Sequence, residues 1–127
     1  MLTSSRINNL AEVELTVRDV YSKHYPMQDI TRCQIKFEYI TSGPYTCVLW
    51  CEPVGSGLPR MLIKQKIKTD QDVDTQIEYE TMANLWKLGY ASETSLRIPQ
   101  PFHYDVKNNF IVMEFIHGKK LSRILAF

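Results

Sequence analysis

The stretch "MLIKQKIKTDQDVDTQIEYETMANLWKLG", residues 61–89, predicts a β-strand followed by a helix. In its first part, the period of two of a strand places Leu62, Lys64 and Lys66 on one face and Met61, Ile63, Gln65 and Ile67 on the other. Its second part, residues 73–88, carries apolar side chains at helical spacing. Two kinds of charge therefore need an explanation, a lysine within an apolar strand and glutamates on the following helix.

The two glutamates of this helix are predicted to have different surroundings. At about 100° per residue, Glu80 falls on the polar side, near Lys87. Glu78 falls within a broad apolar arc formed by Ile77, Tyr79, Met82, Leu85, Trp86 and Leu88. Burying a carboxylate is costly unless it meets a cation, and Lys64 is the nearest candidate in sequence. We therefore expect a buried Lys64–Glu78 ion pair, with a lysine extending into solvent on the outer side of the sheet as the alternative.

The remaining periodicities predict an α+β domain. We expect a helix between Arg6 and Tyr25, ended by Pro26, and a helix at 73–88, capped by Asp70 or Asp72 and ended by Gly89. Five strands are expected at residues 32–40, 46–52, 60–67, 102–106 and 110–116. The prediction is thus a five-stranded antiparallel sheet with one long helix between strands 3 and 4 and an N-terminal helix.

Three segments follow from this order: an N-terminal helical segment at 1–30, the sheet and its helix at 31–117, and the start of another helix at 118–127. "GSG" at 55–57 is interpreted as a connecting turn between the second and third strands.

Composition excludes several classes of protein. The chain has 127 residues, enough for one domain, with 44% hydrophobic and 23% charged residues, as in ordinary globular proteins. A net charge of +1 predicts binding neither to nucleic acid nor to an anionic membrane surface. No apolar run is long enough to span a membrane, and the charged N-terminus differs from a signal peptide, so we expect a cytoplasmic protein.

The cysteines and histidines do not have the spacing of a metal site. Cys33, Cys47 and Cys51 are an odd number without a C-x-x-C pair, and the three histidines lie far apart in sequence. We therefore expect buried thiols, no disulfide framework and no metal ligands among these residues.

Four segments together resemble the N-terminal lobe of the protein-kinase-like fold, most closely that of the aminoglycoside phosphotransferase and choline kinase type. They are "LIK" at 62–64, "EYETMANLWKLG" at 78–89, "IPQPFHYD" at 98–105 and "FIVMEFIHGKKL" at 110–121. Members commonly show E-Y-x-x-[LM]-x-x-L on a helix, then a proline-containing entry into a strand, then a strand ending in [LIV]-M-E-[FY]-[ILV]-x-G-x-x-L. The resemblance implies the ATP-binding lobe of a small-molecule phosphotransferase, with GTP as a possible alternative donor.

The resemblance also implies roles for individual residues. Lys64 would contact the α and β phosphates of ATP, and Glu78 would hold Lys64 in place. The other implied positions are Met113 at the back of the adenine pocket, Glu114 and Ile116 in the linker whose backbone binds the adenine edge, and Leu62 and Val48 over the ring. On pattern alone, the apolar run 110–113 fits an ordinary sheet core equally well.

The chain departs from this family in two respects. The turn "TSGPYT" at 41–46 has one glycine, and Pro44 lacks a backbone donor that could meet a phosphate. The H-x-D-x-x-x-x-N segment and the later aspartate, which supply the catalytic and Mg²⁺-binding acids, do not occur in these 127 residues. We therefore expect this chain alone to be inactive and to need a C-terminal lobe for the metal and the acceptor, whose identity the sequence does not specify.

Two alternatives remain open at this point. The chain could be a non-catalytic interaction module that self-associates or binds another protein through an exposed apolar surface. The placement of Lys64 and Glu78 could also be incidental in an unrelated α+β domain.

Overall fold

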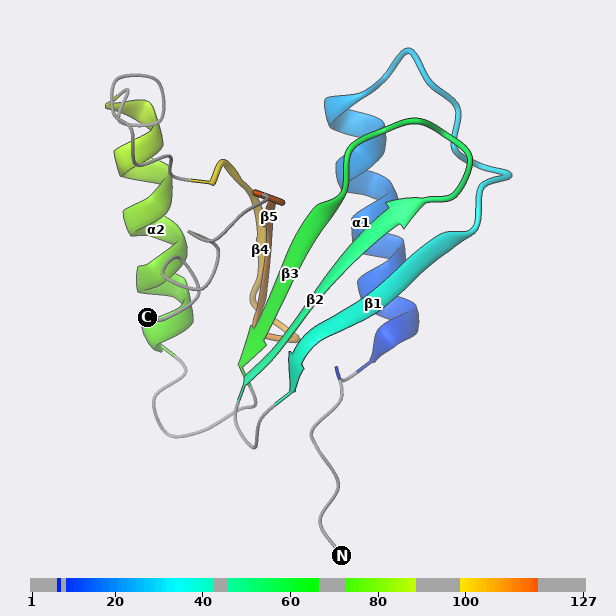
Figure 1. Ribbon diagram of the computed structural model, residues 1–127. Helices are drawn as coiled ribbons and strands as arrows, with labels where there is room; N and C mark the ends of the chain where they lie inside the picture. Colours follow the sequence, from blue (N-terminus) through cyan, green and yellow to red (C-terminus); the bar gives the residue numbers. More distant parts are fainter. Residues whose placement is uncertain (1–6, 8, 43–45, 67–72, 89–98, 117–127) are drawn as a thin grey trace, which may run out of the picture.

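The computed structural model describes residue 7 and residues 9–42, 46–66, 73–88 and 99–116 (Figure 1). Its elements, in chain order, are α1 (Leu10–His24), β1 (Ile35–Ser42), β2 (Thr46–Pro53), β3 (Met61–Lys66), α2 (Val73–Lys87), β4 (Pro101–Asp105) and β5 (Phe110–Glu114). The strands form one antiparallel sheet in the order β1-β2-β3-β5-β4. The predicted α+β class, the five strands and the positions of both helices in the chain are confirmed, and β3 is the central strand.

The element ends differ from the predicted ends by a few residues. α1 begins at Leu10, and the buried Ile7 precedes it outside the helix. β1 begins at Ile35 and extends to Ser42, and the last strand ends at Glu114. The proposed caps at 70, 72 and 89, the turn residues 43–45 and the expected helix at 118–127 lie outside the described residues.

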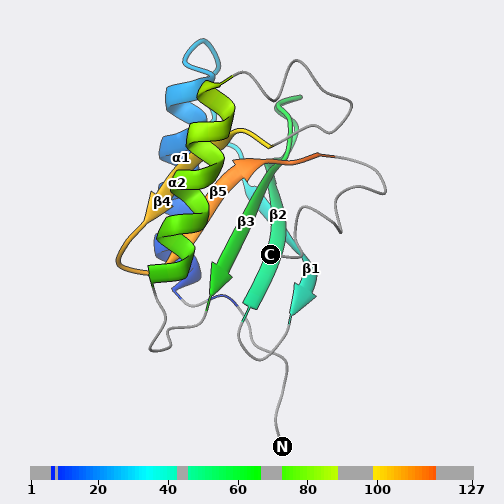
Figure 2. The same ribbon diagram turned by 90° about the vertical axis from the view of Figure 1, so that its left-hand side faces the viewer.

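The sheet has two apolar faces, each covered by one helix (Figures 1 and 2). The face covered by α1 is called the α1 face. The helix residues packed on it are Val13, Val17, Val20 and Tyr21, and their partners in the sheet include Cys47, Leu49 and Cys51 of β2 and Met61 and Ile63 of β3. On the opposite face, called the α2 face, Met82 packs with Val48, Leu62, Ile111 and Met113. Because side chains alternate along a strand, this division follows directly from the period of two in the sequence.

Polar contacts fix α1 at several points of the α1 face. The buried Tyr21 hydroxyl donates to the Pro59 carbonyl oxygen at 2.7 Å and lies 3.2 Å from that of Cys51. At the start of the helix, the Asn9 side-chain amide donates to Asn108 in the β4–β5 turn. α1 is therefore part of the same core as the sheet.

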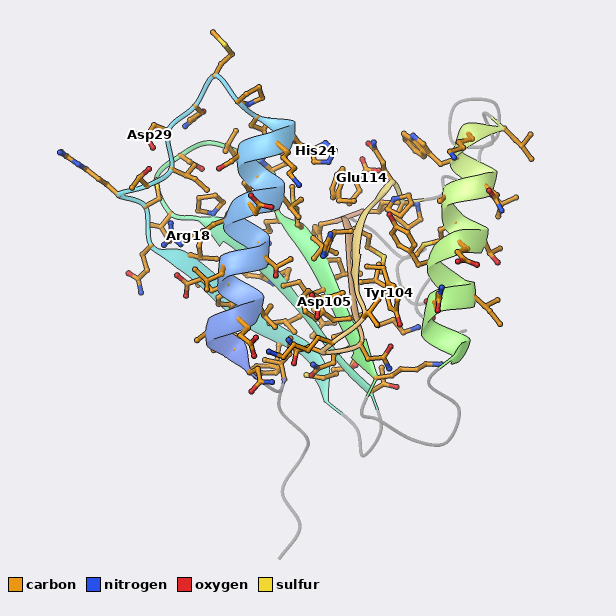
Figure 3. All side chains as sticks on the ribbon, turned by 180° about the vertical axis from the view of Figure 1, so that it is seen from behind. Arg18, His24, Asp29, Tyr104, Asp105 and Glu114 are labelled. Carbon is orange, nitrogen blue, oxygen red and sulfur yellow. The ribbon has the colours of Figure 1, made fainter. Side chains whose placement is uncertain are left out.

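The connection from α1 to β1 is held by Arg18, which Figure 3 shows extending from the helix toward this connection. Its guanidinium donates to the carbonyl oxygens of Ile30 at 3.2 Å and Cys33 at 2.8 Å, and it also pairs with Glu14 at 3.1 Å. These bonds satisfy backbone groups that lie outside the sheet.

α2 contacts the sheet over a narrower strip than its apolar residues predict. Glu78 and Met82 are buried, but Ile77 and Leu88 are 53% and 69% exposed, so the expectation that these two belong to the packed arc is wrong. The reason is that α2 lies over β4 and β5, at one side of the sheet, where only one line of the helix meets the strands (Figure 2).

Candidate functional site

Lys64 and Glu78 form an ion pair within the core. The Lys64 Nζ atom lies 3.0 Å from Glu78 Oε2, and the two side chains are 3% and 7% exposed. Lys64 comes from the central strand β3, and Glu78 from the strip of α2 that contacts the sheet. The predicted pair is confirmed, and the alternative of a lysine extending into solvent is wrong.

The electrostatics of Lys64 follow from this position. Burial lowers the pKa of its ammonium below the ordinary value, and the neighbouring Glu78 carboxylate opposes that shift. Because little water reaches it, the ammonium interacts more strongly with any negative charge placed beside it than an exposed lysine does.

The residues across the strands from Lys64 form the first of two rows on the α2 face. Val48 of β2 lies opposite Lys64 on one side and Ile111 of β5 on the other. The three are called the Lys64 row. Val48 and Ile111 are buried apolar residues, so the two cross-strand neighbours of Lys64 in this row are both apolar.

The second row lies two residues away along β3. Leu62 is flanked by Trp50 of β2 and Met113 of β5, and these three are called the Leu62 row. Leu62 and Met113 belong to one buried cluster with Val48. The structure thus brings four of the predicted site residues, Lys64, Leu62, Val48 and Met113, together on one face with Glu78 above them.

The two predicted linker residues lie at the end of β5. Glu114 is the last residue of this strand; its backbone N–H donates to the Gln100 carbonyl oxygen at 2.8 Å, and its carboxylate accepts from the Gln100 N–H at 3.1 Å. The Glu114 N–H is therefore engaged at the entry to β4, a region that Figure 3 shows from behind. Ile116 follows the strand and is half-buried.

Tyrosine side chains join α2 to β4 beside the ion pair. The rings of Tyr79 and Tyr104 are stacked with their centroids 5.9 Å apart, and the Tyr104 hydroxyl donates to Asn109 Oδ1 at 3.0 Å. Figure 3 shows Tyr104 on the side of β4 that faces α2. The ring contact joins α2 to β4 at Tyr79, the residue that follows Glu78.

Sequence reasoning missed Trp50 and Arg60. The Arg60 guanidinium carbon lies 3.8 Å from the centroid of the Trp50 ring, and Lys36 Nζ lies 5.6 Å from it. Arg60 also pairs with Glu52 at 3.6 Å. A signal was present in the sequence, because Trp50 is two residues from Val48 on the same strand and must therefore share its face.

The connection between β2 and β3 is a turn, as predicted for "GSG". Gly55 and Gly57 have φ angles of +78° and +75°, a conformation that residues with side chains rarely adopt. This turn lies at the end of β3 that begins with Met61, away from Lys66 at the other end.

Within the described ranges, no group of three or more histidine, cysteine, aspartate and glutamate residues is arranged to hold a metal ion. In the same ranges, no helix combines the length and apolar character needed to cross a membrane. Neither the profiles of known protein families nor the curated protein sequences contain a match to this chain.

Proposed function

We propose that this chain forms the nucleotide-binding lobe of an ATP-dependent small-molecule phosphotransferase of the aminoglycoside phosphotransferase and choline kinase type. The observation that carries the proposal is the buried ion pair between Lys64 on the central strand and Glu78 on the helix that follows it.

A purely structural role explains this pair poorly. Replacing a buried ion pair by apolar residues of similar volume is often neutral or stabilising, so the charges contribute little net stability. A lysine ammonium is a compact donor of three hydrogen bonds, and a carboxylate at 3.0 Å fixes its position. Such a group is suited to holding phosphate oxygens.

The surrounding residues support the same assignment. Leu62, Val48 and Met113 form a buried apolar cluster beside Lys64, and an apolar surrounding of this kind suits a nucleobase. We assign the base to this surface and to the backbone of the segment that includes Glu114 and Ile116, and the phosphates to Lys64. The metal ion and the acceptor are assigned to a C-terminal lobe, and the lobe described here does not catalyse transfer alone.

Calorimetric titration of Mg-ATP into the 127-residue chain tests this proposal. We expect saturable binding that is lost in the double variant Lys64→Met/Glu78→Leu, which keeps the interior filled while removing both charges. The matched control is Lys23→Met/Asp19→Leu, which also removes one positive and one negative charge but from an exposed pair on α1, across the sheet. Absence of binding to the wild-type chain at millimolar Mg-ATP, or unchanged binding by the double variant, contradicts the proposal.

A second candidate function, self-association, is favoured by one observation on α2. Leu88 directly follows α2, and its N–H donates to the Asn84 carbonyl oxygen at 3.1 Å, as in a further helical residue. It lies eleven positions from Ile77, which places the two exposed side chains on the same side of the helix. Light scattering tests this function. A concentration-dependent dimer that Ile77→Ser/Leu88→Ser abolishes supports it, and a monomer at all concentrations contradicts it.

A further inference from the structure

Trp50 occupies a position that the proposed function has not yet used. It lies on the α2 face, in the Leu62 row, directly across the β2–β3 ladder from Leu62. Trp50 lies on the same face of the sheet as Lys64, because residues 48, 50 and 52 of β2 point to the same side as residues 62 and 64 of β3. Val48, by contrast, lies in the Lys64 row. The β2 residue beside the site assigned to the base is therefore Trp50.

The groups that lie over the Trp50 ring are unusual for a buried tryptophan. Trp50 is 7% exposed, yet the groups placed over its ring are the cations of Arg60 and Lys36. Both cations reach solvent, since their side chains are 37% and 54% exposed. The Glu52 carboxylate, 3.6 Å from the Arg60 Nε atom, is a partner of Arg60 besides the ring.

A guanidinium that lies over an indole ring marks a place that another planar group can take. Arginine guanidinium planes and nucleobases both stack on aromatic rings. The Phe115 ring lies 6.0 Å from the same guanidinium, so aromatic groups from β2 and from the segment after β5 are near Arg60.

The spacing between the two rows suits a nucleotide. Trp50 and Val48 are two residues apart on one strand, which separates the Leu62 row from the Lys64 row by about 7 Å. A nucleotide likewise carries its base and its first phosphates on opposite ends of one ribose. A base on the Leu62 row therefore leaves the phosphates within reach of Lys64.

We propose that the nucleobase stacks on Trp50 in the place now taken by the Arg60 guanidinium. This inference rests on the proposed function and adds the residue that receives the base. Since every nucleobase has a flat face, Trp50 selects a planar base and does not distinguish adenine from guanine.

The tryptophan content of the chain allows a direct test. Its two tryptophans are Trp50 and Trp86, so Trp86→Phe leaves Trp50 as the only indole. We expect ATP to quench the fluorescence of Trp86→Phe with the same midpoint that calorimetry gives. Trp50→Phe, which keeps only Trp86, is the matched control and should show little quenching.

A second measurement separates the base from the phosphates. We expect Trp50→Leu to bind ATP about tenfold more weakly than the wild-type chain does, as loss of one stacked base predicts. Binding of inorganic tripolyphosphate, which has no base, should not change in this variant. Circular dichroism establishes whether Trp50→Leu is folded; if it is not, the quenching of Trp86→Phe decides the question alone.

The outcomes distinguish this inference from the function on which it rests. If ATP binds in a Lys64-dependent manner but Trp50 fluorescence does not respond, the base lies elsewhere and the stacking inference is wrong while the function stands. If Trp50→Leu weakens ATP and tripolyphosphate equally, the role of Trp50 is structural and the inference is overturned. If ATP does not bind the wild-type chain at all, both proposals fall.

Discussion

Lys64 on the central strand and Glu78 on α2 meet at 3.0 Å with almost no exposed surface on either side chain. The Glu78 carboxylate therefore offsets part of the hydration that the Lys64 ammonium loses, because burial acts against the ammonium and the carboxylate acts in its favour. The position of α2 over the sheet is coupled to this contact.

We predict that removing one member of the pair destabilises the protein far more than removing both. Lys64→Met leaves the Glu78 carboxylate buried without its cation, at an expected cost of about 3–5 kcal/mol in the free energy of unfolding. Lys64→Met/Glu78→Leu should recover most of that loss. Urea denaturation of the wild type, both single variants and the double variant measures the coupling. Equal, additive losses in the two single variants would show that the pair is not formed in solution.

We predict that substitutions at apolar positions in and just after α2 differ strongly in their effect on the free energy of unfolding, although helical periodicity places these positions in the same arc. Met82→Ala should lower the free energy of unfolding by about 2–5 kcal/mol, since this side chain is buried among Val48, Leu62 and Met113. Ile77→Ala and Leu88→Ala should change it by no more than about 0.5 kcal/mol in the monomer, because both side chains are exposed. Thermal unfolding at low protein concentration measures all three, and a large loss for Ile77→Ala contradicts the described placement of α2.

We predict that stability falls as the pH rises above about 9. Burial raises the pKa of the Cys51 thiol from 9.0 to about 12 and also raises the pKa of the Tyr21 hydroxyl above its ordinary value. The folded state therefore holds protons that the unfolded chain releases, and each such group removes about 1.4 kcal/mol per pH unit between its two pKa values. Urea midpoints measured from pH 8 to pH 11 test the trend.

The titration of Lys64 changes the free energy of unfolding in the opposite direction, over an adjoining pH range. Its pKa is lowered in the folded state, so the cost of burying the ammonium diminishes as the pH rises from that lowered pKa toward the ordinary value of 10.5. Variants separate the contributions: Cys51→Ala should reduce the alkaline loss, and Lys64→Met/Glu78→Leu should increase it. An unchanged alkaline slope in Cys51→Ala contradicts the assignment to that thiol.

We predict that a single thiol reacts in the native protein. Cys47 and Cys51 are buried, and the raised pKa of Cys51 further suppresses its thiolate, whereas Cys33 is half-buried. At pH 8 a colorimetric disulfide reagent should modify one thiol per chain, and three after unfolding in urea. Loss of the fast reaction in Cys33→Ser identifies the residue, and two fast thiols in the native protein would contradict the described burial.

Much of the candidate site follows from the sequence because local periodicity is sufficient to define it. The alternation of residues 61–66 places Leu62 and Lys64 on one face, and the helical period places Glu78 with Met82. The cost of burying an unpaired charge then selects Lys64 as the partner of Glu78, and the structure has that pair.

The extent of packing on α2 does not follow from the sequence. Ile77 and Met82 belong to the same predicted arc, yet one is exposed and the other buried, because α2 lies mainly over β4 and β5, at one side of the sheet. Helical periodicity describes one helix and contains no information about the width of the surface beneath it.

The sequence by itself determined the α+β class, the order of the elements, and the pairing of a strand lysine with a helix glutamate. Only the tertiary structure decided the strand order with β5 next to β3, and the register that places Trp50 opposite Leu62 and Val48 opposite Lys64. The physical reason is that side-chain alternation is a property of each strand, whereas register depends on how neighbouring strands are joined and where they are irregular. The choice of Trp50 as the residue beside the base therefore comes from contacts between strands, which no single segment encodes.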